Sequence, residues 1–150
     1  MEDRYLFKAK RIDNGEWEIG SLIALPTGEY EISNKCNNPP DCDPMWDKVV
    51  ITHKVEPPTI CQCTGLKDKN GNMIWENDVI KYHFRDLYAQ IRYGAYQSCF
   101  DSQKTEHIGF YVDWSGGRHY RKDLGYWINM VNAEVVGNIF DNPELLESEG

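Results

Sequence analysis

The stretch TGLKDKNGNMIWENDVIKY, which begins at Thr64, constrains the fold more than any other part of the chain. It places two turns between short apolar runs, and Asn-Gly at the first turn favours the positive φ angles of a tight hairpin. Asparagine tolerates a left-handed conformation, which suits it to the second turn. The stretch therefore predicts three short strands joined by two turns. The residues expected to form the turns are Gly65, Asn70, Gly71, Asn77 and Asp78.

The same alternation of short runs and turns continues along the chain and predicts a mainly β protein. Asn14-Gly15 and Thr27-Gly28 separate three strand-like runs, and the later run IGFYVDW alternates apolar with other residues. We expect one small barrel-like domain over residues 1–150, built from short antiparallel strands and hairpins with little helix. Its expected parts are an N-terminal meander (1–33), a loop-rich segment with several prolines (34–58), core strands (59–142) and an acidic tail that opens with a helical turn (143–150).

Composition restricts the environment and the partners of the chain. The formal net charge is −8, from 24 acidic and 16 basic residues, which opposes non-specific attraction to nucleic acid or to an acidic membrane face. The first residues are charged where a signal peptide would be apolar, and no apolar run is long enough to span a bilayer. We therefore expect a cytoplasmic protein without a membrane partner. The odd number of cysteines also favours free thiols in a reducing compartment: Cys36, Cys42, Cys61, Cys63 and Cys99.

No cofactor or metal is expected from the motifs. The turn around Gly71 lacks the Lys and Ser or Thr of a phosphate loop. Aligned as a calcium loop, it has Leu66 and Asn77 at two positions that need acidic ligands. The pairs Cys36 with Cys42 and Cys61 with Cys63 do not have the usual spacing of zinc ligands, although the four thiols can still meet in space.

Catalysis is a lower alternative, since no hydrolase or zinc-protease motif occurs in the chain. Cys63 or Cys99 could act as a nucleophile with a histidine base, and two carboxylates could form an acid/base pair, but the spacing does not show that these groups meet. Carboxylates beside a turn more often bind the backbone. The candidate bases are His107 and His119, and the candidate carboxylate pair is Glu76 with Asp78.

Nucleic-acid binding is the main alternative, because one short segment combines cations with aromatic rings. Such combinations hold single strands on β surfaces, whereas a charged edge strand is the simpler interpretation. The segment consists of Arg118, His119, Tyr120, Arg121 and Lys122. Lys81, Arg85 and Arg92 extend this patch only if they lie on the same face.

The sequence resembles the YopX proteins of bacteriophages and prophages. The resemblance is carried by TGLKDKNGNMIWENDVIKY, by PPTICQC before it, by EVVGNIFDNPELLE near the end and by the opening RYLFKAKRIDNGEWEIGSLI. Asn77 stands where that family usually has glycine. The resemblance implies a compact, mainly β fold with a barrel-like core, encoded by a phage or prophage and located in the bacterial cytoplasm. It implies no catalytic or cofactor residues.

Together these observations predict a non-enzymatic β domain that works by protein association. The partner is either a second copy, giving a homo-oligomer, or a host or phage protein. The hypothesis follows from the number of strands that can be exposed and from an aromatic content of 13%, because aromatic residues are enriched at interfaces.

Overall fold

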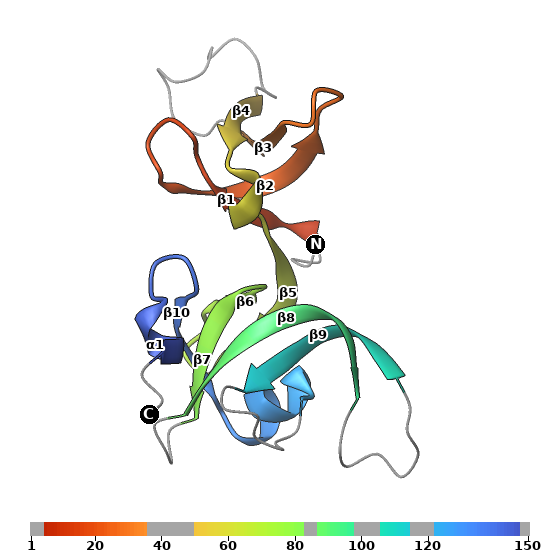
Figure 1. Ribbon diagram of the computed structural model, residues 1–150, viewed down its shortest axis with the longest axis vertical. Helices are drawn as coiled ribbons and strands as arrows, with labels where there is room; N and C mark the ends of the chain where they lie inside the picture. The colour runs from red at the N-terminus through yellow and green to blue at the C-terminus, as the bar shows by residue number, and fades with distance from the viewer. Residues whose placement is uncertain (1–4, 36–49, 83–86, 98–105, 115–121, 148–150) are drawn as a thin grey trace. The chain divides into compact units, whose positions relative to one another are not determined.

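A computed structural model describes residues 5–35, 50–82, 87–97, 106–114 and 122–147 (Figure 1). Antiparallel strands dominate these segments and only short helical turns occur, so the expected mainly β class with little helix is confirmed. Neither sheet closes into a barrel within the described strands. The chain divides into two compact units, residues 1–63 (unit 1) and residues 64–150 (unit 2).

Unit 1 contains the three strands of the predicted N-terminal meander, a further strand that pairs with the third of them, and the beginning of another. Its elements are β1 (Phe7–Lys10), β2 (Trp17–Ala24), β3 (Tyr30–Lys35), β4 (Val50–Val55), the 3-10 turn η2 (Pro57–Thr59) and the start of β5 (Cys61–Lys67). The strands pair antiparallel in the order β4-β3-β2-β1-β5. Gly15 and Gly28 adopt φ angles of 72° and 89° in the first two turns, values that glycine reaches without steric cost.

The core of unit 1 is small. Ala9, Ile32 and Val55 are buried together, and half-buried apolar residues from neighbouring strands pack against them. At Gly20 the adjacent strand comes so close that a Cβ would overlap the carbonyl oxygen of Ser33. Glycine is therefore required there by contact rather than by its φ angle.

Unit 2 is built on a second antiparallel sheet. Its elements are the rest of β5, β6 (Met73–Trp75), β7 (Asp78–Tyr82), β8 (Leu87–Gln97), β9 (Glu106–Trp114), the π-helical turn η4 (Tyr126–Met130), β10 (Glu134–Asn138) and α1 (Glu144–Glu147). β5 and β6 form a hairpin, while the other strands follow the order β10-β7-β8-β9. Figure 1 shows β8 (green) and β9 (teal) running together as a long curved ribbon with β9 at the edge.

Residues 126–130 lie in the segment expected to supply core strands, yet they form the π-helical turn η4. The reason is packing: Trp127 and Ile128 are buried in this turn, and the Trp127 ring contacts the Trp114 ring at 4.6 Å between centroids. The rest of the core of unit 2 consists of Ile74, Ile80, Ala89, Ile91, Val112, Leu124 and Ala133.

Candidate functional site

The hairpin of β8 and β9 extends beyond the core of unit 2. Its strands pair without interruption from Ala89 opposite Trp114 to Gln97 opposite Glu106. At the inner end, Ile91 and Val112 are fully buried. We call the outer part, residues 93–97 and 106–110, the distal arm.

One side of the distal arm is apolar and exposed. Side chains alternate between the two faces of a strand, so the odd-numbered residues of β8 and their even-numbered partners on β9 continue the face that holds the core. Ile108 is 76% exposed and Tyr93 is 55% exposed, whereas Phe110 packs against the core. Tyr93 and Phe110 meet edge to face at 5.0 Å. We call Tyr93, Ala95, Ile108 and Phe110 the apolar face.

The opposite side of the arm carries a short aromatic stack. Tyr96 stacks on His107 and on Tyr111, with ring centroids 5.2 Å apart in both pairs. Gly94 and Gly109 face each other between these rings and have no side chains to fill the space. We call Tyr96, His107 and Tyr111 the aromatic face. The ring of Tyr96 already lies against two neighbours, so a stacked base would have to compete with them.

Three cations share this second side of the sheet. Lys81 lies opposite Tyr88 and reaches its ring at 5.9 Å, and Lys122 reaches the Tyr111 ring at 6.0 Å. Arg92 lies opposite Tyr111 but forms an ion pair with Asp113 at 3.1 Å. Lys81 and Arg92 therefore share a side of the sheet with Lys122, which is the one described residue of the predicted patch. The other residues of the patch, Arg118, His119, Tyr120, Arg121 and Arg85, lie outside the described residues.

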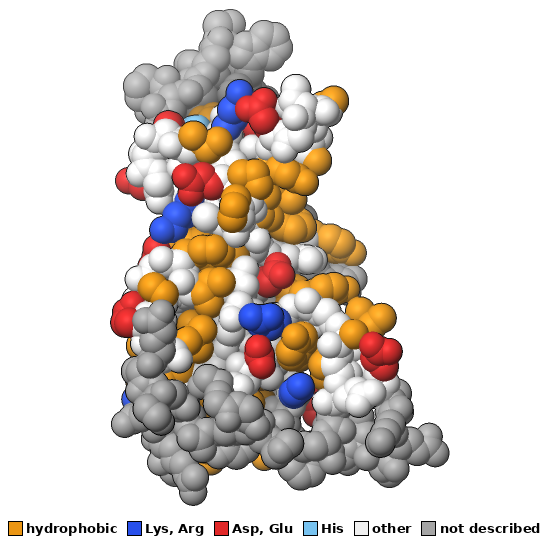
Figure 2. All heavy atoms as spheres, in the orientation of Figure 1, with side chains coloured by type: hydrophobic (Ala, Val, Ile, Leu, Met, Phe, Trp, Pro, Cys, Tyr) orange, Lys and Arg blue, Asp and Glu red, His pale blue; other side chains and the backbone are white. Residues whose placement is uncertain are grey.

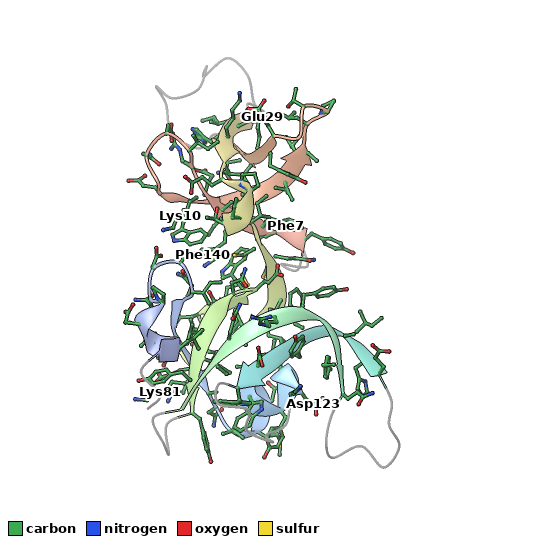
Figure 3. The ribbon with its side chains drawn as sticks, viewed as in Figure 1. Phe7, Lys10, Glu29, Lys81, Asp123 and Phe140 are labelled. Carbon is green, nitrogen blue, oxygen red and sulfur yellow. The ribbon has the colours of Figure 1, made fainter. Side chains whose placement is uncertain are left out.

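Charges are mixed on the described surface. Figure 2 shows Lys and Arg side chains interspersed with Asp and Glu and with apolar groups on the face in view. Lys81 and Asp123, both labelled in Figure 3, also belong to unit 2 and have opposite charge. The described side chains in this view therefore form no large basic field of the kind that attracts nucleic acid.

The motif at residues 64–82 holds unit 2 together. The carboxylate of Asp68 is buried and accepts hydrogen bonds from the backbone N–H groups of Asn70 and Asn72 in its own turn, both at 2.9 Å. A third N–H comes from Val135 on β10 at 3.0 Å. Burial acts to raise the pKa of Asp68, but these donors outweigh it and hold that pKa below its usual value. Both carboxylate oxygens of Asp68 thus face hydrogen-bond donors rather than a cation.

The second turn of the motif connects three strands. Asn77 adopts φ 71°, its N–H donates to Ile91 O at 2.7 Å, and its carbonyl accepts from Ile139 N at 3.0 Å. The buried carboxylate of Asp78 accepts from Trp75 N at 2.8 Å. Gly65 and Gly71 also have positive φ angles, 83° and 81°. Asp78 thus binds the backbone, and Glu76, the other carboxylate considered for an acid/base pair, is half-buried beside the same turn.

The candidate nucleophiles are enclosed or outside the described residues. Cys61 and Cys63 are buried free thiols, and Cys61 donates to Thr59 O at 3.2 Å. A nucleophile needs access to its substrate, which full burial denies to Cys63. Cys36, Cys42, Cys99 and His119 lie outside the described residues. Within the described segments, no three His, Cys, Asp or Glu side chains gather as metal ligands.

Unit 1 contains one polar cluster that the sequence did not indicate. Asn34 Nδ2 donates to Glu18 Oε1, and Glu18 Oε2 lies 3.7 Å from His53 Nδ1 and 3.9 Å from Arg11. Arg11 also binds Asp13, and that hydrogen bond lowers the pKa of the Asp13 carboxyl. The cluster balances the charge of a half-buried carboxylate.

A protein-family model described as YopX protein matches residues 6–147. The chain belongs to the YopX family. No curated protein matches it significantly. This YopX chain is similar to the crystal structure of protein EF1440 from Enterococcus faecalis, with 22% sequence identity, a TM-score of 0.50, and coverage of 93% of this chain and 96% of that one. At that identity the likeness shows the fold alone.

Sequence reasoning missed the apolar face of this YopX chain. The alternation in IGFYVDW correctly groups Ile108 and Phe110 with Val112 and Trp114, but alternation does not tell where the covering layer ends. The available signal was length: β8 has 11 residues and β9 has 9, whereas a typical strand has about 5–6. None of the described helices has the length and hydropathy needed to span a membrane.

Proposed function

We propose that this YopX-family chain acts without catalysis, by protein association through the apolar face of the distal arm. The supporting observation is the 76% exposure of Ile108 on the same strand face as the buried core. We also propose, from the resemblance to phage and prophage proteins, that it acts in the cytoplasm of a bacterial host.

Energetics favour a partner on this face over permanent exposure to water. Burial of one isoleucine or phenylalanine side chain contributes about 1.5–3 kcal/mol. Tyr93, Ile108 and Phe110 are adjacent in the strand pairing, so one partner segment can cover all three. Apolar centres surrounded by polar residues are typical of binding surfaces.

The test compares two equally exposed apolar residues of unit 2. Ile108→Glu places a charge on the apolar face, whereas Met130→Glu places one on η4, where Met130 is 74% exposed. Affinity-tagged wild type and both variants are incubated with host lysate to which isotope-labelled, untagged chain has been added, with and without nuclease, and retained proteins are identified by mass spectrometry.

The proposal predicts a protein partner that survives nuclease treatment, is retained by Met130→Glu and is lost by about 10-fold or more with Ile108→Glu, because one buried isoleucine is worth about that factor in affinity. Equal retention by all three forms would contradict it.

Single-stranded nucleic acid is the second candidate, supported by the three cations that share a side with the aromatic face. Against it stand the net charge of −8 and the ion pair that neutralises Arg92. Lys122→Ala is expected to weaken oligonucleotide binding and to reduce its salt dependence if this candidate is correct. The measurement is fluorescence anisotropy with a labelled oligonucleotide at several salt concentrations, with Lys54→Ala in unit 1 as a control.

A further inference from the structure

We propose that a second copy of this chain associates at the distal arm by antiparallel pairing of β9 with β9 of the second copy across a two-fold axis at Ile108, so that the two Ile108 side chains of the apolar face contact each other. This inference rests on the proposed function and names the partner that contacts Ile108 of the apolar face. Two observations support it: β9 has outward-pointing backbone groups, and its side chains and charges are compatible with those of a second β9 across this axis.

β9 is the edge strand of its sheet among the described strands. Among the described residues, part of its outer side is covered, because Val112 N donates to Lys122 O at 2.9 Å and Tyr111 bridges Asp123. Within the described residues, no strand lies along the outer side of Glu106 to Phe110. An edge of this kind is a template for another extended strand.

The bond made by Val112 determines which residues point their backbone groups outward. In antiparallel sheets the outward-pointing residues alternate along a strand, and the register with β8 is uninterrupted. Phe110 and Ile108 therefore direct their N–H groups outward, as Val112 does. With the axis at Ile108, the two copies of this residue exchange both backbone hydrogen bonds.

The side chains fit this axis. His107 lies opposite Gly109 of the second copy, where the structure leaves open space: a Cβ on Gly109 would meet no atom within 4 Å. Phe110 lies opposite Glu106 of the second copy, and Ile108 lies beside its own counterpart. The two apolar faces then lie on the same side of the joined sheets and meet at the paired Ile108 side chains, while Tyr93 on β8 lies one strand away from the axis.

The charges also fit. Glu106 is the only carboxylate in the run from Glu106 to Phe110. Under this axis the two Glu106 residues lie about 14 Å apart along the strand direction, from four steps of roughly 3.4 Å. That distance exceeds the screening length of about 8 Å at physiological salt. The pairing thus avoids opposing like charges, which matters for a chain of net charge −8.

Oxidative cross-linking tests the axis directly. Cys36, Cys42 and Cys99 are replaced by Ser, while the buried Cys61 and Cys63 remain. Either Ile108→Cys or Phe110→Cys is then added to this full-length background. Directly paired residues have Cα atoms about 5.5 Å apart, within disulfide range, whereas the two Phe110 positions would be about 14 Å apart.

The proposal predicts a disulfide-linked dimer with Ile108→Cys and at most a trace with Phe110→Cys. In light scattering without oxidant, the wild type and Met130→Glu are expected to be dimers, and Ile108→Glu is expected to dissociate at least about 10-fold more readily. Cross-linking that is equal at both positions would overturn the proposed axis. A wild type that stays monomeric at every concentration would overturn self-association.

The outcomes separate this inference from the proposed function. A monomeric wild type whose lysate partner is lost only with Ile108→Glu overturns self-association and leaves association through the apolar face standing. A monomeric wild type whose retained proteins are the same with Ile108→Glu overturns both.

Discussion

Asp68 binds the backbone of Val135, which follows 67 residues later in the chain: Val135 N donates to Asp68 Oδ2 at 3.0 Å. The other oxygen, Oδ1, accepts from Asn70 N and Asn72 N. One buried carboxylate thus fixes a hairpin turn and fastens it to β10. The most distinctive motif of the family resemblance therefore has a structural role: it joins the hairpin turn to β10. The candidate interaction surface lies elsewhere, on the distal arm.

Asp68→Asn is expected to lower the free energy of unfolding by about 1–3 kcal/mol, because an amide NH2 replaces one oxygen and leaves a buried donor without its acceptor. The measurement is urea denaturation followed by tryptophan fluorescence. Asp113→Asn is the matched control, since Asp113 is 43% exposed in an ion pair and exposed pairs contribute about 0–1 kcal/mol. Equal losses of unfolding free energy in the two variants would refute the structural role of Asp68.

The contribution of Asp68 is expected to depend on pH. The pKa of this carboxyl is lower in the folded chain than its ordinary value of 3.8, so the folded state binds its proton less readily than the unfolded state. The stabilisation is fully present well above 3.8 and is lost as pH falls through the lower folded pKa. The difference in unfolding free energy between wild type and Asp68→Asn should shrink below pH 3.8. A difference that stays constant into that range would contradict the assignment.

Asn77 tests the left-handed turn. Asn77→Ala and Asn77→Gly both lose the side-chain hydrogen bond from Gln90. Only alanine also meets the steric cost of φ 71°, about 1–2 kcal/mol. The glycine variant is therefore expected to be the more stable of the two by roughly 1 kcal/mol in thermal denaturation. Equal melting temperatures would show that the turn carries no backbone strain.

Gly20 tests the close approach of two strands in unit 1. Gly20→Ala is expected to cost about 1–3 kcal/mol, because its Cβ overlaps the backbone of Ser33. Gly125→Ala is the control: Gly125 has helical angles, and the nearest atom to its Cβ would lie at 3.9 Å. Chemical denaturation of both variants should show a loss for the first only, and a stable Gly20→Ala would mean that the strands separate easily.

Much of the fold could be predicted because turn chemistry is local. Asn-Gly and Thr-Gly pairs, together with Asn77, mark places where the chain must adopt positive φ, and the strands follow between them. The turn η4 could not be predicted in this way, since a short apolar run such as GYWINM suits a buried strand as well as a buried helical turn.

The candidate site was harder to predict because its features depend on contacts that are distant in sequence. The exposure of Ile108 depends on how far the buried residues of η4 and the neighbouring strands extend under the hairpin. The alternation of β9 gives the face of each side chain, but only the packed structure gives its exposure.

Amide hydrogen exchange can show whether the chain associates through the apolar face of the distal arm. Exchange is measured on the full chain in dilute solution and in its associated state, either concentrated or with a captured partner. Amides of residues 106–110 are expected to exchange at least about 10-fold more slowly on association, while those of residues 126–130 are unchanged. Unchanged exchange at residues 106–110 in an associated sample would contradict the account.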